Sequence, residues 1–315
     1  MGRLKVCFVG IGSIAKRHIR NLCTVCQEKK INLTIDAFRR KKKNVDEDIQ
    51  NYIGQVFTDG QELPDDYDVI FITNPTSMHL NTLQKLHGKA KHFFIEKPLT
   101  SYEKREQVFG IKYRAESVYY VACPLRYTSV IQYLKENIQL SDAISVRCIS
   151  SSYLPEWRPD VDYRRTYSAN RALGGGVSID LIHEWDYIKF LFGTPDKIFY
   201  TSGKKSLLEL ECEDYAIYVA DYSDKVIELH LDYFGRKALR EIMIITNDDT
   251  VVGDLINNKI SYLNRGKEVH FHEDRNEWHK RELEYFLDII DGKNVCNNSI
   301  MDARKTILFT QGEIE

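Results

Sequence analysis

The sequence lacks a strong net charge, a long apolar run and a paired set of cysteines. Its 315 residues include 44 Lys and Arg against 46 Asp and Glu, a formal charge of −2. Surfaces that bind nucleic acid are usually basic, so this balance excludes a dedicated nucleic-acid binder. No segment contains the roughly 18 consecutive apolar residues that a membrane helix needs. We therefore expect neither nucleic acid nor a membrane among the partners.

The seven cysteines are scattered along the chain. A secreted disulfide framework needs pairs, so an odd and dispersed set indicates free thiols in a reducing cytoplasm. The N-terminal apolar run, 6–9, leads into glycines and does not read as a signal peptide. Cys23 and Cys26 form a C-x-x-C motif without a second pair, and His270 and His272 lack a third ligand nearby in sequence. We predict a cytoplasmic protein without a bound metal.

Apolar residues make up 43% of the chain, enough for two cores at about 150 residues per domain. The first 122 residues alternate short apolar runs with amphipathic segments, a pattern typical of βαβ units and a parallel sheet. Ser77 is the expected N-cap of the helix that follows the third strand. Strands are expected at 4–9, 32–38, 68–73, 92–95 and 119–122, with a first helix over 13–26.

The pattern changes after residue 122. Long alternating strands with few helices between them favour a mostly antiparallel sheet. We expect an α/β chain: a parallel-sheet domain over 1–122 and an α+β domain with a large open sheet over 123–315. The expected strands of the second domain are 143–151, 197–202, 215–222, 226–233, 240–246, 250–254 and 259–262, with helices over 130–137, 177–192 and 277–290.

A glycine motif lies between the first strand and the first helix, where a phosphate-binding turn belongs. The segment Gly10-Ile11-Gly12-Ser13-Ile14-Ala15 fits G-x-G-x-x-G/A. Gly10 permits the tight turn, and Gly12 leaves room for a pyrophosphate. The helix start offers N–H groups and partial positive charge to the phosphates. We predict dinucleotide binding; a plain glycine turn is the alternative.

The residue at the end of the second strand usually selects the cofactor. An acid there binds the ribose hydroxyls of NAD, whereas an arginine accommodates the 2′-phosphate of NADP. Here Arg39 and Arg40 are followed by Lys41, Lys42 and Lys43, and Asp36 falls inside the strand. We favour NADP, with NAD as the alternative. A solvated basic loop explains the same residues without any role in selection.

Several further motifs give the chain a family resemblance. They are Thr73-Asn74-Pro75, His79, Gly88, Glu96-Lys97-Pro98, Gly174-Gly175-Gly176, Asp180 and His183-Glu184-Trp185-Asp186. In these residues the chain resembles the Gfo/Idh/MocA oxidoreductases. The resemblance implies a Rossmann domain followed by an open-sheet domain, a cis proline after Lys97, and a homodimer or homotetramer. It also implies NAD(P)-dependent chemistry on a sugar or polyol. It adds Thr73, Asn74, Pro75, His79, Glu96 and Lys97 to the cofactor-binding residues.

Hydride transfer at a carbinol carbon needs a proton acceptor and a group that stabilises negative charge on oxygen. Lys97 follows a parallel strand, at the edge where open α/β sheets bind ligands. His183 is the expected acid/base, since its ordinary pKa lies near neutrality. Asp180 and Asp186 flank it at three residues, within reach of one helix face. Many relatives space the first Asp four residues before the His.

The irregular stretch 153–173 is rich in rings and arginines. Aromatic faces and arginines suit a sugar that carries phosphate or carboxylate. An arm that contacts another subunit explains the same composition. Together, Arg126, Arg158, Arg164 and Arg165 indicate an anionic or nucleotide-linked sugar. The candidate substrate-binding residues are Lys97, Arg126, Trp157, Arg158, Tyr163, Arg164, Asp180 and His183.

The leading hypothesis is an NADP-dependent oxidoreductase of a sugar, amino sugar or sugar nucleotide, with a possible place in surface-polysaccharide biosynthesis. Two alternatives remain open: a reductase of a non-sugar substrate, such as a cyclic imine or tetrapyrrole, and a dinucleotide-binding redox sensor without catalysis. The presence of Lys97 and His183 argues against the sensor.

Overall fold

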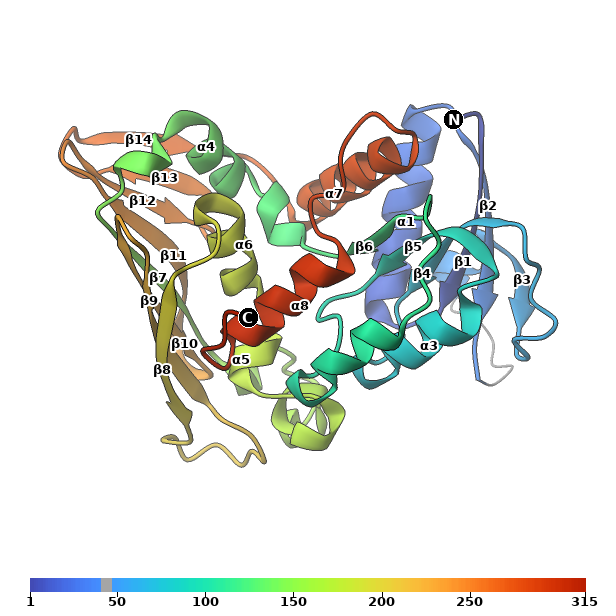
Figure 1. The fold of residues 1–315 in the computed structure, drawn as a ribbon, viewed down its shortest axis with the longest axis horizontal. Coiled ribbons are helices and arrows are strands. Elements are labelled where there is room, and N and C mark those ends of the chain that lie inside the picture. Colours follow the sequence, from blue (N-terminus) through green and yellow to red (C-terminus); the bar gives the residue numbers. More distant parts are fainter. Residues whose placement is uncertain (41–46) are drawn as a thin grey trace. The chain divides into compact units, whose positions relative to one another are not determined.

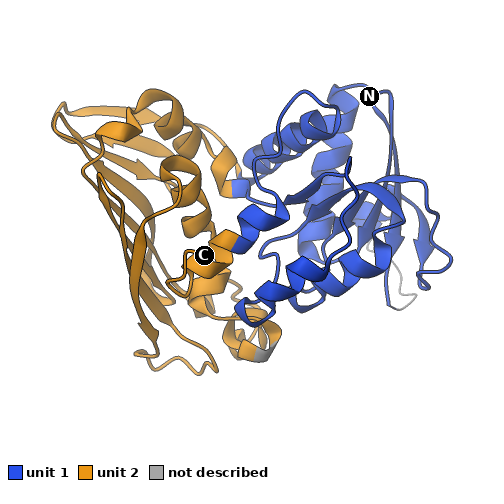
Figure 2. Ribbon diagram, viewed as in Figure 1, with its two compact units in different colours: residues 1–124, 275–304 blue, residues 125–274, 305–315 orange. Residues whose placement is uncertain are grey.

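The computed structural model describes residues 1–40 and 47–315, which form two compact units (Figure 2). The first unit comprises residues 1–124 and 275–304, and the second comprises 125–274 and 305–315. The domain boundary expected after residue 122 lies two residues before this division. The stretch 275–304 returns to the first unit, whereas the expected division assigned it to the second domain. No helix of the described residues is long and apolar enough to cross a membrane.

A six-stranded sheet forms the centre of the first unit (Figure 1). Its order is β3-β2-β1-β4-β5-β6, and neighbouring strands pair in parallel. This is the strand order of a doubly wound dinucleotide-binding fold, in which ligands bind at the carboxyl ends of the strands. The strands are β1 (Arg3–Val9), β2 (Asn32–Phe38), β3 (Ile53–Phe57), β4 (Tyr67–Ile72), β5 (Ala90–Ile95) and β6 (Tyr119–Val121).

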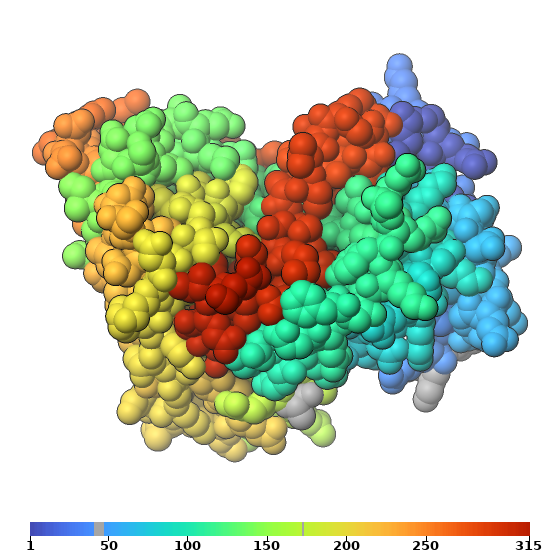
Figure 3. Space-filling model, in the orientation of Figure 1, coloured from blue at the N-terminus to red at the C-terminus, as the bar shows by residue number. Residues whose placement is uncertain are grey.

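The helices of this unit are α1 (Ser13–Glu28), α2 (Glu47–Gln50), α3 (His79–Leu86) and α7 (Arg275–Ile290). Helix α1 packs against α7, and Phe286 of α7 meets Phe71 and Phe94 of the sheet. The two helices therefore cover the same face of the sheet, and the outer side of α7 lies at the surface (Figure 3). The predicted Ser77 cap is wrong. A 3₁₀ turn, Thr76–Met78, precedes α3 and makes Met78 its N-cap.

An eight-stranded sheet forms the second unit, in the order β14-β13-β12-β11-β7-β10-β9-β8. Only β7 and β10 pair in parallel among the described pairs, so the expected mostly antiparallel sheet is confirmed. The strands are β7 (Ser145–Tyr153), β8 (Lys197–Gly203), β9 (Tyr215–Asp221), β10 (Val226–Asp232), β11 (Phe234–Ile245), β12 (Thr250–Asp254), β13 (Lys259–Tyr262) and β14 (Lys267–His270).

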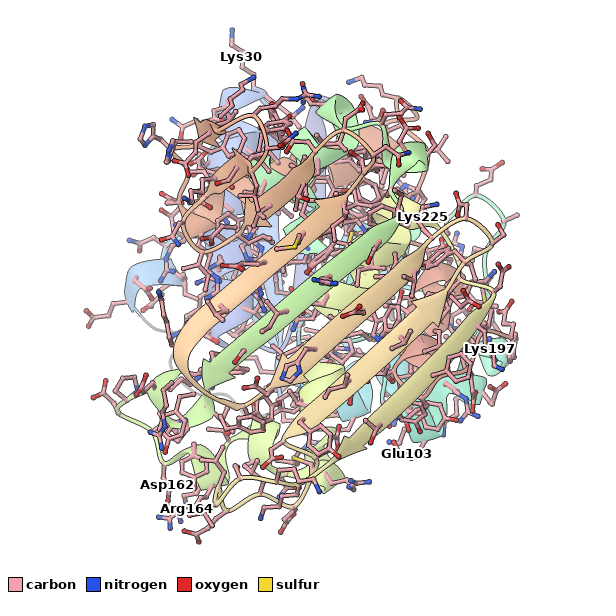
Figure 4. All side chains as sticks on the ribbon, turned by 90° about the vertical axis from the view of Figure 1, so that its left-hand side faces the viewer. Lys30, Glu103, Asp162, Arg164, Lys197 and Lys225 are labelled. Carbon is pink, nitrogen blue, oxygen red and sulfur yellow. The ribbon has the colours of Figure 1, made fainter. Side chains whose placement is uncertain are left out.

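Helices α4 (Ser129–Asn137) and α6 (His183–Phe192) lie on one face of this sheet (Figure 1). Alternate residues of β9 turn toward them: Ala216, Tyr218 and Ala220 are buried, and the residues between them are half-buried or exposed. The other face presents its central strands without a helix in front of them (Figure 4). Helix α8 (Ile300–Phe309) contains the last crossing of the chain from the first unit to the second.

The expected single helix over 177–192 is two helices, α5 (Val177–Asp180) and α6. Two glycines before α5 determine how the chain passes from the preceding loop into this helix. A Cβ at Gly175 would lie 2.1 Å from the carbonyl oxygen of Tyr167, and Gly176 has a φ of +127°. Only glycine fits this close approach and this left-handed backbone.

Candidate functional site

The glycine turn after β1 is held by the neighbouring strands. The Gly10 amide donates to the Phe38 carbonyl at 3.0 Å, and the Thr73 hydroxyl donates to the Gly10 carbonyl at 2.8 Å. Gly10 has a φ of +87°, and a Cβ there would lie 2.9 Å from Asn74 Cα. Thr73 and Asn74, expected near the cofactor, thus fix the shape of the turn. The Asn74 amide donates to Thr82 Oγ1 at 2.7 Å.

Gly12 differs from Gly10 because it faces open space. A Cβ at Gly12 would meet no atom within 4 Å, and Gly12 is the N-cap of α1 without a side-chain hydrogen bond. The first turn of α1 contains no acidic residue, and Ala15 is fully buried behind it. Ser13 and Ile14 begin the helix, whose first N–H groups have no partners within it. An anionic pyrophosphate fits this open helix start.

The end of β2 carries two guanidinium groups, Arg39 and Arg40. Asp36 accepts hydrogen bonds from the Tyr67 hydroxyl at 2.8 Å and the Gln55 amide at 3.0 Å, and it is buried. Its carboxylate is therefore committed inside the sheet and is not offered to a ribose. The lysines 41–43, expected beside the arginines, lie outside the described residues.

Lys97 is the second residue after β5 and is half-buried. Its amide donates to Glu96 Oε2 at 3.1 Å, while Glu96 Oε1 lies 2.5 Å from His18 Nε2. On the other side, His79 lies 3.0 Å from the Pro98 carbonyl and 2.8 Å from the Asn74 carbonyl. The Lys97–Pro98 bond is cis, as the resemblance implies. Two buried imidazoles thus fix the chain on either side of Lys97.

These contacts change the roles of two expected cofactor-binding residues. Glu96 and His79 are 8% and 1% exposed, and their side chains bond to protein groups. They position Lys97 and the strand ends instead of offering free polar atoms. Burial lowers the pKa of His79. Burial alone would raise the pKa of Glu96, but the His18 hydrogen bond and nearby positive charge hold it below its ordinary value.

His18 and His279 form a buried histidine pair that sequence reasoning missed. Their ring centroids are 5.8 Å apart, and His279 comes from α7. Burial is the main reason that the pKa of His279 is lowered to about 3, and the nearby His18 adds to it. A signal was present: position 18 shares the apolar stripe of Ala15 and Leu22 on α1.

In the second unit, Asp180 ends α5 and His183 begins α6, so the two do not share one helix. Asp180 Oδ2 accepts hydrogen bonds from the Ser168 hydroxyl at 2.5 Å and the Tyr233 hydroxyl at 3.0 Å. Tyr233 is fully buried, and this burial raises its pKa well above the ordinary value. The tyrosine therefore stays protonated and donates to the carboxylate, which holds the end of α5 in place.

Arg126 was a candidate substrate-binding residue, but its guanidinium is buried and bonds to a carboxylate of the protein. It is 2% exposed and makes a two-point ion pair with Asp186, at 2.7 Å from Nε to Oδ2 and from Nη2 to Oδ1. Asp186 is likewise drawn away from its expected task of orienting His183. The pair fixes the first turn of α6, on which His183 stands.

The aromatic and arginine-rich stretch forms a loop beyond β7. Trp157 donates from Nε1 to Ser152 Oγ at 2.8 Å and packs edge-on against Tyr233. The Tyr163 hydroxyl accepts from the Glu209 amide at 3.1 Å. Arg164 pairs with Asp162, and the two side chains lie together at one end of the sheet (Figure 4). Arg158 is exposed.

Residues 4–123 match the model of the oxidoreductase family with an NAD-binding Rossmann fold, Gfo/Idh/MocA. The matched residues contain the parallel sheet of the first unit and belong to this family's Rossmann domain. The resemblance seen in the motifs and the expected fold class are thereby confirmed. The first unit contains the matched Rossmann fold, and the second contains the mostly antiparallel sheet.

Glucose-6-phosphate 3-dehydrogenase of Bacillus subtilis is 24% identical over 306 residues, which are 93% of this chain and 79% of that protein. The structure of UDP-N-acetylglucosamine 3-dehydrogenase from Acidithiobacillus ferrooxidans has a TM-score of 0.78 at 18% identity, and the match covers 99% of this chain and 96% of that one. Levoglucosan dehydrogenase in complex with NADH and levoglucosan has a TM-score of 0.84 at 16% identity, over 98% and 95% of the chains. An uncharacterized oxidoreductase of Bacillus subtilis, 23% identical, is matched over 55% of its length.

Proposed function

We propose that the protein is an NADP-dependent dehydrogenase or reductase of a sugar derivative that carries an anionic group. The observation that carries the proposal is the open helix start at Gly12 on the same sheet edge as Lys97. Parallel strands β1 and β5 both end there, so the residues that follow them lie where a doubly wound sheet binds its ligand. The relatives that act on sugars support the substrate class.

Lys97 is the proposed group that stabilises negative charge on the reacting oxygen. An ammonium donates hydrogen bonds to an alkoxide or a carbonyl, and Glu96 and the Pro98 carbonyl hold the backbone on both sides of it. When bound, the nicotinamide supplies or accepts the hydride. His183 is the proposed acid/base, whose imidazole takes or returns the hydroxyl proton. Asp180 and Asp186 anchor the helices on either side of His183.

The preference for NADP is supported by Arg39 and Arg40 at the end of β2 and by the commitment of Asp36 to Tyr67. The anionic substrate is supported by Arg158 and Arg165, which are exposed on the loop beyond β7. Arg164 is less suited to this task because Asp162 and Glu209 already pair with it. Trp157 and Tyr163 give the same loop two ring faces. A role in surface-polysaccharide biosynthesis agrees with a sugar-nucleotide substrate.

The proposed assembly is a homo-oligomer formed through the outer face of the eight-stranded sheet. This face exposes Phe199, Ile217 and Val219 together with both members of the Arg147–Glu228 pair. Apolar side chains bordered by both signs of charge suit pairing with a second copy. Val219→Lys is expected to lower the mass measured by light scattering, and the control Leu263→Lys, in the turn after β13, is not. The proposed location is cytoplasmic, because the seven cysteines are odd in number and scattered along the chain.

The enzyme assignment is tested by turnover of NADPH or NADP with a panel of free, phosphorylated and nucleotide-linked sugars. Lys97→Ala and His183→Ala are expected to bind NADPH normally and to lose roughly a hundredfold or more in kcat. Lys91→Ala, an exposed lysine of the same strand, is the matched control. A wild type that binds NADPH but turns over no member of the panel would refute the assignment and favour a dinucleotide sensor.

A further inference from the structure

The Glu96 carboxylate connects a buried histidine to the backbone of Lys97. Glu96 Oε1 lies 2.5 Å from His18 Nε2, and Oε2 accepts the Lys97 amide at 3.1 Å. Both oxygens are therefore used, one on each side. Because a carboxylate is planar, fixing one oxygen fixes the direction of the other. The contact with His18 thus sets the orientation of the peptide that enters Lys97.

Among the described residues, Glu96 is the hydrogen-bond partner of the His18 side chain. Its side chain is fully buried, with Phe94 packed edge-on at 5.1 Å between ring centroids. Among the residues that the structure describes, His18 Nδ1 has no hydrogen-bond partner. A buried polar ring that makes a single hydrogen bond is costly to keep in an apolar core. The contact with Glu96 is what the imidazole contributes.

The position of His18 links it to the cofactor turn as well. It lies on α1, the helix whose first residue follows Gly12. A rigid helix therefore runs from the proposed pyrophosphate position to the group that orients Glu96. Besides His18, the charged and titratable groups that act on Glu96 are Lys97 and His279 of α7. His279 is itself faced by Arg17 of α1 and by Arg275 and Glu282 of α7, and Tyr120 of β6 donates to Glu282.

We propose that His18 is a positioning residue, which acts through Glu96 to fix Lys97 at the end of β5 and to keep a negative charge beside its amine. This rests on the proposed catalytic role of Lys97. The Lys97 ammonium is one of the charges that lower the pKa of Glu96, so the ionised Glu96 and the Lys97 ammonium attract each other. Without His18, burial would act on Glu96 with less opposition and favour its neutral form.

The test is competitive labelling of Lys97 with acetic anhydride across pH, read by mass spectrometry, in the full chain. His18→Leu removes the donor, Glu96→Gln removes the charge, and His18→Gln supplies an amide donor in place of the imidazole. We expect the labelling of Lys97 to reach half its maximum about one pH unit lower in His18→Leu and Glu96→Gln. His18→Gln is expected to stay close to the wild type, and the labelling of Lys91 is expected to be unchanged in all variants.

Activity adds a second readout where the wild type turns over a sugar. The same two variants are expected to lose about tenfold in kcat, with NADPH affinity within about twofold, and His18→Gln to recover most of the loss. Coincident Lys97 labelling curves in Glu96→Gln and the wild type would overturn the proposal, even if His18→Leu does not fold. A wild type without turnover would refute the enzyme assignment alone, since the labelling curves would still decide the role of His18.

Discussion

Arg126 and Asp186 hold each other in a buried two-point ion pair, with two nitrogen–oxygen distances of 2.7 Å. The guanidinium also lies over the ring of Phe190, at 5.0 Å from its centroid. The pair joins the start of the second unit to α6, so a residue that suggested substrate binding has a structural task. Loss of this ion pair is therefore expected to lower the stability of the second unit.

Asp186→Leu is expected to destabilise the second unit by about 3 kcal/mol, because it leaves a buried guanidinium without its partner. The double variant Arg126→Leu/Asp186→Leu is expected to be more stable than the single one. Urea unfolding followed by tryptophan fluorescence measures both, since Trp157 and Trp185 lie in this unit. The exposed pair Lys259–Glu268 is the control, and Lys259→Leu is expected to change stability much less than Asp186→Leu. If Asp186→Leu has normal stability and a raised KM for the substrate, the structural role is wrong and Arg126 is a substrate-binding residue.

Gly10 and Gly12 are expected to respond differently to the same substitution. Gly10→Ala places a Cβ 2.9 Å from Asn74 Cα at a φ of +87°, so it is expected to lower the melting temperature. The Cβ of Gly12→Val meets no atom within 4 Å in the free protein, and the substitution is expected to change stability by no more than about 1 kcal/mol. It occupies the space that the pyrophosphate needs, so NADPH affinity is expected to fall at least about tenfold, or 1.4 kcal/mol. Unchanged NADPH binding by Gly12→Val would show that the cradle lies elsewhere.

Local sequence patterns predicted the strands and helices that have a regular apolar pattern, and they predicted the sharp glycine turn after β1. Strands β1 and β4 contain continuous apolar runs at 6–9 and 69–72, and α1 has an apolar stripe directly after the glycine motif. Strand β3 escaped prediction because its residues are only half-buried or exposed and include Gly54. The 3₁₀ turn before α3 also has no clear signature. The conformation of the turn before a helix depends on residues that are close in space, and the periodicity of apolar residues in the sequence does not show them.

Partners far along the chain explain the remaining differences in the site. His18 pairs with Glu96 at a separation of 78 residues, and Arg126 with Asp186 at 60. A single sequence contains no signal for such pairs, so Glu96 and Arg126 looked like ligand-binding groups. The residue types at the site were predictable from motifs. Which of them face a ligand and which hold others in place depends on tertiary contacts.

Cofactor preference is expected to depend on the end of β2. The double variant Arg39→Ser/Arg40→Ser removes two guanidinium groups near the proposed 2′-phosphate. Hydrogen bonds to charged groups are worth about 1.5–3 kcal/mol, so NADPH affinity is expected to fall by roughly tenfold or more. NADH affinity is expected to stay the same. Fluorescence titration of both cofactors measures this, with Arg3→Ser at the opposite end of β1 as the control. Tighter binding of NADH than of NADPH by the wild type would overturn the preference.

His279 is expected to make the protein less stable in acid. Its pKa is about 3 in the folded chain, chiefly because of burial, against an ordinary value of 6.5. Between these values the unfolded chain binds a proton that the folded chain does not, so stability falls as the pH falls through this window. One such proton contributes a slope of about 1.4 kcal/mol per pH unit.

The measurement is the free energy of unfolding in urea at several pH values between 7 and 4, roughly the window in which one proton is taken up on unfolding. His279→Leu is expected to show a shallower dependence than the wild type, by close to one proton, because its unfolded chain lacks the imidazole that titrates. His272→Leu, an exposed histidine just before α7, is expected to keep the wild-type slope. Parallel curves for His279→Leu and the wild type would mean that the His18–His279 pair takes up its proton without unfolding, and the buried cluster under Lys97 would then be open to protons in the native state.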